Sequence, residues 1–288
     1  MKLSVVLPAK NESEAVANVI EGIRELYGDA EIIVVDDGST DATAKIAEGV
    51  GAKVVRHLYS KGNGAAIKSG ARQARGDVIV FMDADGQHSP SDIPRLLEAL
   101  EEGHDMVVGA RQSGSQASMG RGLANGFYNS LATYMTGHRV EDLTSGFRAV
   151  RAQKFREFLY LLPNGFSYPT TSTMAFFRAG YSVFYVPIHA AKRVGTSHIK
   201  PFKDGVRFLL IIFKIGTLYS PLKLFAPIAA FIMILATFWY GYTYLLHGRF
   251  TNMSALLYTG GVMIFLMGLI SEQITALMYK DSAGQDRS

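Results

Sequence analysis

The 288-residue sequence contains no cysteine. This absence excludes disulfides, thiolate zinc sites, iron–sulfur clusters and a thiol nucleophile, and it fits a reducing compartment. The formal net charge is only +4, from 29 Lys and Arg against 25 Asp and Glu. A charge this small does not indicate a nucleic-acid partner, and we expect none.

Several common catalytic and cofactor motifs are also missing. The segment Gly62-Asn63-Gly64 resembles a dinucleotide-binding loop, but Ile67 occupies the third glycine position and also interrupts the Walker-like Lys68-Ser69. The seven histidines include no pair at the spacing of a helical zinc site, and no Gly-x-Ser-x-Gly elbow occurs. The segment 61–64 (KGNG) leaves two interpretations open: a turn that opens a helix, or part of the wall of a donor site.

Charge is absent from two long stretches near the end of the chain. An apolar fraction of 48% already excludes a disordered or collagen-like chain, and residues 224–246 and 251–271 carry no charged side chain. A bilayer core requires roughly 20 apolar residues of helix. Buried helices of a soluble domain are the alternative, but two such runs side by side favour a transmembrane hairpin.

The distribution of cations predicts how this hairpin is oriented. Seven cations precede the first run: Lys192, Arg193, Lys200, Lys203, Arg207, Lys214 and Lys223. The loop between the runs holds only Arg249, and the first residues, Met1–Leu7, are too short and polar-flanked for a signal peptide. By the positive-inside rule we expect a multi-pass protein of the cell (inner) membrane, with the N-terminal domain and both termini in the cytoplasm.

The first 190 residues alternate between short β-branched runs and segments with helical periodicity. Strands are expected at 3–7, 31–35, 52–55, 77–82, 105–109 and 181–188, and helices at 14–26, 41–50, 64–74 and 91–100, with Ser13, Thr40 and Ser91 as caps. This alternation predicts an α/β fold with a mostly parallel, doubly wound sheet. Ligands of such sheets bind at the carboxyl ends of the strands.

Polar clusters follow three of these expected strands. They are Pro8–Glu12 (PAKNE), Asp36–Ser39 (DDGS) and Asp83–His88 (DADGQH). The alternating oxygen donors Asp83, Asp85 and Gln87 suit a hard divalent cation such as Mg²⁺ or Mn²⁺. The alternative is a polar turn with a capping aspartate.

An ordered set of motifs resembles a known family. PAKNE, DDGS, KGNGAAIKSG, DADGQH, GAR (109–111), DLTSGFR (142–148) and RVGTSH (193–198) follow one another as in glycosyltransferase family 2 enzymes that make polyprenyl-phosphate sugars, of the dolichyl-phosphate mannose synthase type. The resemblance covers about residues 1–200. It implies a GT-A nucleotide-sugar domain.

The resemblance also implies roles for single residues. The nucleotide-sugar site would comprise Pro8, Lys10, Glu12, Val35, Asp37, Asp83, Ala84, Arg111 and Arg193, and the metal site Asp83, Asp85 and Gln87. Asp85, Arg111 and Arg193 would be catalytic, and Ser145, Arg148 and Ser197 would face the acceptor phosphate. Two departures affect specificity: Lys10 replaces a common aromatic residue, and 166–180 is hydroxyl-rich where relatives carry an acidic residue.

The expected reaction is an inverting, metal-dependent transfer of a hexose from a GDP- or UDP-sugar to polyprenyl phosphate. The alternatives are a polysaccharide synthase, although the only tryptophan, Trp239, lies outside any Q-x-x-R-W motif, a glycolipid synthase, and a non-catalytic nucleotide-sugar-binding subunit. A homo-oligomer is possible.

We expect four regions in the chain: a GT-A domain at 1–198, an interfacial amphipathic segment at 199–220, a transmembrane hairpin at 221–280 and a cytoplasmic tail at 281–288. Helical spacing places Lys200, Lys203, Arg207 and Lys214 on one face of the amphipathic segment. That face would meet either anionic headgroups or the acceptor phosphate.

Overall fold

The computed structural model describes residues 2–111, 119–165, 167–189, 216–217 and 219–284, with the backbone alone for 119–125 and 278–284. The chain divides into two compact units, Met1–Ile199 and Lys200–Ser288, which are described separately. The predicted boundary after residue 198 and most of the predicted interfacial segment lie outside the described residues. Both stay predictions.

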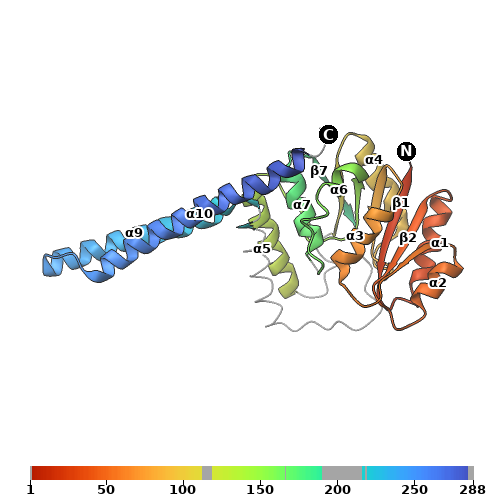
Figure 1. Ribbon diagram of the computed structural model, residues 1–288, viewed down its shortest axis with the longest axis horizontal. Coiled ribbons are helices and arrows are strands. Elements are labelled where there is room, and N and C mark those ends of the chain that lie inside the picture. Colours follow the sequence, from red (N-terminus) through yellow and green to blue (C-terminus); the bar gives the residue numbers. More distant parts are fainter. Residues whose placement is uncertain (1, 112–118, 166, 190–215, 218, 285–288) are drawn as a thin grey trace. The chain divides into compact units, whose positions relative to one another are not determined.

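The first unit is built on a seven-stranded sheet with the spatial order β3-β2-β1-β4-β6-β5-β7. Its strands are β1 (Leu3–Ala9), β2 (Glu31–Asp36), β3 (Lys53–Arg56), β4 (Val78–Phe81), β5 (Met106–Arg111), β6 (Arg148–Arg151) and β7 (Val183–Ile188). Every pair is parallel except those of β6, which runs antiparallel to both β4 and β5. The carboxyl ends of β1, β2, β4 and β5 therefore share one edge with the start of β6. Strands β1 and β2 lie side by side in this sheet (Figure 1).

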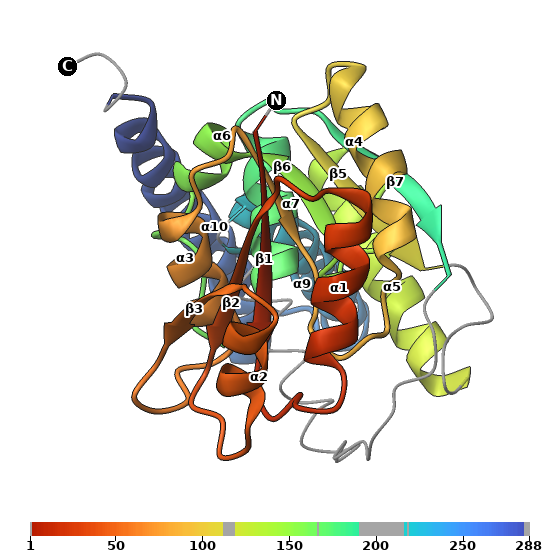
Figure 2. The same cartoon turned by 90° about the vertical axis from the view of Figure 1, so that its right-hand side faces the viewer.

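Helices cover both faces of this sheet (Figure 2). One face holds α1 (Val16–Leu26), α2 (Thr43–Gly49), the short 3₁₀ helix η1 (Pro90–Asp92) and α4 (Ile93–Glu101). The other holds α3 (Asn63–Gln73), α6 (Ala152–Arg156) and α7 (Tyr168–Arg178), and α5 (Met119–Thr136) packs against α7. The expected α/β fold with a mostly parallel sheet is confirmed.

Alternation along the strands supplies the two halves of the core. Val5 and Leu7 of β1 face the α1 and α4 side, where Ile20 and Leu96 are fully buried. On the opposite face α3 approaches the sheet closely at Gly70, where an added Cβ would lie 2.2 Å from Val6 Cγ1. That glycine is required because a larger side chain would force helix and sheet apart.

Two groups of local predictions differ from the structure. The caps Ser13, Thr40 and Ser91 are wrong, because the helices begin after Ala15, Ala42 and Asp92, whose side chains make no capping bond. Hydrogen bonds between the two loops hold the starts of α1 and α2 instead. Before α4, Ser89 Oγ accepts a hydrogen bond from Ser91 N at the start of η1. The sequence patterns also missed β6 and the helices α5, α6 and α7. Glycine and hydroxyl residues hide the apolar period of α5 and α7, while β6 and α6, with four and five residues, are too short to show one.

The second unit contains two long helices, α9 (Pro221–His247) and α10 (Asn252–Gly284). Pro221–His247 and Asn252–Leu277 are long and apolar enough to cross a membrane, and only 11% and 17% of their most apolar windows are buried within the protein. Exposed apolar surface on this scale marks contact with lipid or another protein. Gly248 ends α9 in the left-handed conformation, with φ of 63°.

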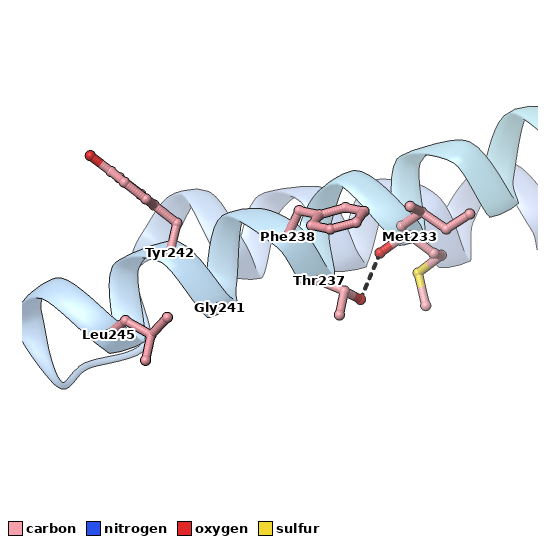
Figure 3. A pocket seen from close by; sticks show the side chains of 7 residues that line it. Met233, Thr237, Phe238, Gly241, Tyr242 and Leu245 are labelled. Atoms are coloured by element: carbon pink, nitrogen blue, oxygen red, sulfur yellow. Dashed lines mark hydrogen bonds between the residues drawn. The ribbon is translucent and has the colours of Figure 1, made fainter.

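Small residues let α9 and α10 pack closely. A Cβ added to Gly261 would lie 2.8 Å from Met233 Sδ, and one added to Gly268 would lie 2.8 Å from Phe225 Cβ. The Thr237 and Tyr258 hydroxyls meet at 3.0 Å across the pair. An open apolar depression also runs along α9 from Met233 to Leu245, beside Gly241 (Figure 3).

Candidate active site

The polar clusters predicted from the sequence meet at the carboxyl edge of the sheet. Pro8 and Val35 are paired in register and buried within β1 and β2, and Lys10 is the first exposed residue beyond β1. Asn11 adopts a left-handed conformation with φ of 56°, and its Oδ1 accepts a hydrogen bond of 2.8 Å from Thr40 N. The PAKNE and DDGST loops therefore brace each other.

Asp37 is an anchor for the loop at 57–62. His57 Nδ1 lies 2.7 Å from its carboxylate, and Ser60 Oγ, Lys61 N and Gly62 N each donate to it at 2.8 Å. Burial alone would raise the pKa of Asp37, but these hydrogen bonds together lower it to about 2. Asp37 is thus a permanent anion that shapes the loop. Its predicted contact with a nucleoside stays a prediction.

The glycines of KGNG serve a close backbone contact. A Cβ on Gly62 would lie 2.4 Å from Asn164 O, and one on Gly64 would lie 2.0 Å from Pro163 O. Gly64 N and Ala65 N, at the start of α3, donate to Gly165 O and Asn164 O. These first amides of α3 are therefore bonded to the protein, which favours the interpretation of KGNG as a turn that opens a helix.

The acidic turn after β4 holds the predicted metal ligands. Asp83, Asp85 and Gln87 are half-buried, and Gly86 turns the chain with φ of 71°. Among the described residues, no three His, Cys, Asp or Glu side chains gather closely enough to hold a metal. Two carboxylates and one amide are therefore the protein oxygens that this turn offers, a donor set that suits Mg²⁺ or Mn²⁺ completed by phosphate oxygens.

The surroundings of Asp83 are supplied by distant segments. Gly146 lies so close that an added Cβ would sit 3.2 Å from Asp83 Oδ2. Tyr168 Oη of α7 donates to Gly146 O at 2.9 Å. Buried His88 stacks on Phe147 with ring centroids 5.2 Å apart, and its Nε2 lies 3.9 Å from Asp83 Oδ2. Neighbouring Ala84 is only 1% exposed, so its side chain packs inward.

Arg111, at the end of β5, is held by Asp142. Its Nε lies 2.8 Å from Asp142 Oδ2 and its Nη2 lies 3.0 Å from Oδ1, and Nη2 also donates to Thr144 Oγ1 at 2.6 Å. Burial alone would lower the pKa of Arg111, but Asp142 raises it. Burial alone would raise the pKa of Asp142, but Arg111 lowers it. Both groups therefore stay charged, and the guanidinium has one fixed orientation.

Arg148, predicted at the acceptor phosphate, is fully buried instead. Its Nη1 donates to Pro169 O at 3.0 Å, Ser172 Oγ at 2.8 Å and Thr173 Oγ1 at 3.2 Å, and Nη2 donates to Ser145 O. No carboxylate of the described residues lies within 4.0 Å of it, and burial lowers its pKa. The guanidinium does not reach the surface here and instead ties β6 to α7. Arg148 is therefore placed to stabilise the contact between β6 and α7.

Ser145 is the remaining acceptor-side residue that the structure describes. Ser145 Oγ is buried and has no hydrogen-bond partner in the described part of the protein. Arg193 and Ser197 lie outside the described residues. The sequence motif DLTSGFR located this region, but the contacts of Asp142 and Thr144 with Arg111 were missed, because they join residues 31 and 33 positions apart.

Solved structures share this fold. Glucosyl-3-phosphoglycerate synthase from Mycobacterium tuberculosis, in complex with Mn²⁺, UDP-glucose and phosphoglyceric acid, is 25% identical with a TM-score of 0.60, covering 75% of this chain and 78% of that one. A second complex of that synthase, with Mn²⁺ and UDP-glucose, is 26% identical with a TM-score of 0.58, covering 75% of this chain and 78% of that one. The sheet order and the acidic turn after β4 define a GT-A fold.

The family follows from the sequence comparisons. A model described as glycosyl transferase family 2 matches residues 4–159, and one described as the GtrB C-terminal hairpin matches residues 220–277. The chain belongs to glycosyl transferase family 2 and is a glycosyltransferase, as the motifs predict.

Curated relatives include proteins from bacteria and an archaeon. Glycosyltransferase AglJ from Haloferax volcanii is 29% identical over 78% of this chain and 75% of the relative. Undecaprenyl-phosphate 4-deoxy-4-formamido-L-arabinose transferase from Pseudomonas fluorescens is 29% identical over 99% of this chain and 87% of the relative. The protein of that name from Proteus mirabilis is 37% identical over 52% of this chain and 49% of its own length.

Proposed function

We propose that this protein transfers a hexose from a nucleoside-diphosphate sugar to polyprenyl phosphate, with inversion at the anomeric carbon. The observation that carries the proposal is the combination in one chain of a GT-A site and an apolar helical hairpin. A relative named as an undecaprenyl-phosphate sugar transferase is similar over 99% of the chain, so the similarity extends across both units.

Two carboxylates at the site, Asp37 and Asp142, support an acceptor that needs no general base. Asp37 and Asp142 have lowered pKa values and are held by hydrogen bonds and by Arg111. A carboxylate with a low pKa removes protons from a hydroxyl poorly. The hydroxyl-rich helix α7 carries no acidic side chain. A phosphate oxygen is already anionic near neutral pH and can attack without help.

Catalysis then depends on positioning and on charge. The diphosphate of the donor would lie between the acidic turn after β4 and Arg111, whose guanidinium suits phosphate oxygens. Asp83, Asp85 and Gln87 are the residues we propose to hold a divalent cation, Mg²⁺ or Mn²⁺. When bound, the cation would neutralise charge on the leaving diphosphate. Asp85, Arg111 and Arg193 are the proposed catalytic residues.

The remaining residues are assigned by their places in the site. Pro8, Lys10, Glu12, Val35 and Asp37 line the edge formed by β1 and β2, where we place the nucleoside. Asp83 and Ala84 would meet the donor beside the metal. Ser145 and Ser197 are proposed on the acceptor side. The buried hydroxyl of Ser145, which has no hydrogen-bond partner among the described residues, supports this role.

The hairpin is proposed to cross the bilayer, with both termini and the catalytic unit in the cytoplasm. The exposed apolar faces of α9 and α10 support a lipid environment. A tag inserted at residues 248–251 should be reachable only from outside, and tags at both termini only from the cytoplasm. An N-terminus found outside would contradict access to cytoplasmic nucleotide sugars.

One experiment tests the transfer reaction directly. The full-length protein in lipid nanodiscs is incubated with Mg²⁺ or Mn²⁺, polyprenyl phosphate and a panel of radiolabelled UDP- and GDP-sugars, and the lipid-extractable label is measured. The acceptor control is polyprenol, which lacks the phosphate. We expect label in a monosaccharide lipid only with polyprenyl phosphate. Transfer to polyprenol, or growth of a polymer, would favour a glycolipid or polysaccharide synthase instead.

A variant pair tests the metal assignment within the same assay. Asp85→Ala should abolish transfer because it removes a metal ligand and not a core side chain. Asp29→Ala, at an exposed position of the first unit, is the control and should retain full activity. Full activity of Asp85→Ala at saturating Mg²⁺ and Mn²⁺ would exclude the proposed site.

A further inference from the structure

The helix α5 carries a polar stripe that holds the segment returning from it. Asn129 Nδ2 donates to Glu141 O at 2.5 Å, and Asn129 Oδ1 accepts from Leu143 N at 3.0 Å. One side-chain amide therefore bonds the backbone on both sides of Asp142. The asparagine amide offers a donor and an acceptor, and this contact uses both.

The stripe continues one and two turns further along the helix. Thr133 Oγ1 accepts from Val140 N at 3.0 Å, and Thr136 Oγ1 accepts from His138 N at 3.1 Å. Residues 129, 133 and 136 share one helix face, so the segment 138–143 runs back along α5, bonded at each turn. Its backbone has little freedom to shift relative to the helix.

Asp142 lies near the end of the segment 138–143, which this ladder of hydrogen bonds from α5 holds in place. Its two oxygens receive Arg111 Nε, Nη2 and the backbone Arg111 N, the last at 3.2 Å. Thr144 N and Thr144 Oγ1 each donate to Oδ1 at 3.1 Å. The carboxylate is only 5% exposed, so it presents one orientation to the guanidinium. Asn129 fixes the backbone, the backbone fixes Asp142, and Asp142 fixes Arg111.

We propose that Asp142 and Asn129 are positioning residues that aim Arg111 at the donor diphosphate. The inference rests on the proposed function, which gives Arg111 its phosphate partner. Neither residue touches the substrate in this scheme. Asp142 directs the guanidinium by accepting two hydrogen bonds from it, which a lysine at position 111 could not donate in the same geometry. Asn129 acts one step further away, by holding Asp142 in register.

A double-mutant cycle separates positioning from a general structural role. Asp142→Asn keeps the size of the side chain but removes one acceptor, and we expect kcat for transfer to fall roughly 10- to 100-fold. Arg111→Ala should lower kcat by at least as much. If Asp142 acts through Arg111, the double variant should be within about twofold of Arg111→Ala alone. If the losses of kcat from the two single variants multiply in the double variant, the proposal is overturned.

A matched pair on α5 tests Asn129. Asn129→Ala removes both backbone contacts, whereas Ser130→Ala changes the neighbouring, exposed residue of the same helix. We expect Asn129→Ala to lower kcat roughly 10-fold while the catalytic unit remains folded, and to have no further effect in the Arg111→Ala background. Equal effects of both substitutions would contradict the assignment.

Hydrogen exchange gives a readout that does not depend on the substrate. In the full-length protein, mass spectrometry of the backbone amides at 140–144 should show faster exchange in Asn129→Ala than in the wild type and in Ser130→Ala, because Leu143 N loses its acceptor. Unchanged protection would overturn the positioning role even if transfer is active. If Asn129→Ala exchanges faster but the wild type transfers no sugar, the proposed function is refuted. The role of Asn129 in holding the segment 138–143 would still stand.

Discussion

Asp37 and Arg148 are two buried charges of opposite sign in the same unit, and the protein stabilises them differently. Asp37 is 5% exposed and receives four hydrogen-bond donors, which lower its pKa to about 2. Arg148 is 0% exposed and is surrounded by carbonyl and hydroxyl oxygens, and its pKa is lowered by burial. The hydrogen bonds to Asp37 outweigh the unfavourable effect of burial on its charged form. The contacts of Arg148 do not outweigh the effect of burial on the charged guanidinium.

This difference separates two kinds of structural role. The donors around Asp37 come from the loop at 57–62 and therefore shape a surface beside the proposed nucleoside site. The acceptors around Arg148 belong to α7 and to Ser145, so the guanidinium joins the core to the proposed acceptor side. A buried charge can thus organise the segments that surround a site. The two charges also predict different responses to substitution.

Removing the charge of Arg148 should have the largest effect. Arg148→Met keeps most of the length but leaves the carbonyls of Pro169 and Ser145 without their donor, so we expect the free energy of unfolding of the catalytic unit to fall by about 3–5 kcal/mol. Urea titration of the full-length protein in detergent measures this. Arg148→Lys should recover part of the loss. A change below about 1 kcal/mol would show that the buried contacts are weak.

Substituting Asp37 should have a smaller effect that depends on pH. Asp37→Asn keeps the shape but offers an NH₂ group where two donors require an acceptor, and we expect a loss of about 2 kcal/mol at pH 7. The same urea titration measures it. Asp29→Ala, at an exposed position, should leave stability unchanged.

The sign of the pH dependence follows from the lowered pKa. The pKa of Asp37 is about 2 in the folded protein, against an ordinary value of 3.8. Its stabilisation is therefore complete above about pH 4 and is lost as the pH falls through about 2. The wild type should lose stability across this window more steeply than Asp37→Asn. Parallel pH profiles of the two proteins would contradict the lowered pKa.

The smallest effects should come from two buried serines beside Arg148, with opposite signs. Ser172→Ala removes an acceptor of Arg148 and should cost about 1 kcal/mol. Ser145→Ala removes a buried hydroxyl that has no partner among the described residues, and should stabilise the unit by up to about 1 kcal/mol. If Ser145 meets the acceptor phosphate, the same variant should raise the acceptor KM. A stable variant with unchanged acceptor kinetics would remove Ser145 from the site.

The sequence by itself determined the features that depend on local pattern. Alternating β-branched runs and helical periods gave the α/β class, and two uncharged runs gave the helices α9 and α10. The polar clusters after β1, β2 and β4 indicated the edge of the sheet where we propose the site. The ordered motifs indicated family 2, which the match to residues 4–159 confirms.

Only the tertiary structure decided what several of these residues do. Arg148 follows a polar motif and resembles an exposed phosphate ligand in the sequence, but β6 lies between β4 and β5, where its first residue is buried. Asp142 meets Arg111, and Asp37 meets the loop at 57–62, through contacts that join distant segments. A side chain's charge is written in the sequence, but its partners depend on which segments pack around it, because burial and hydrogen bonding are properties of the folded chain.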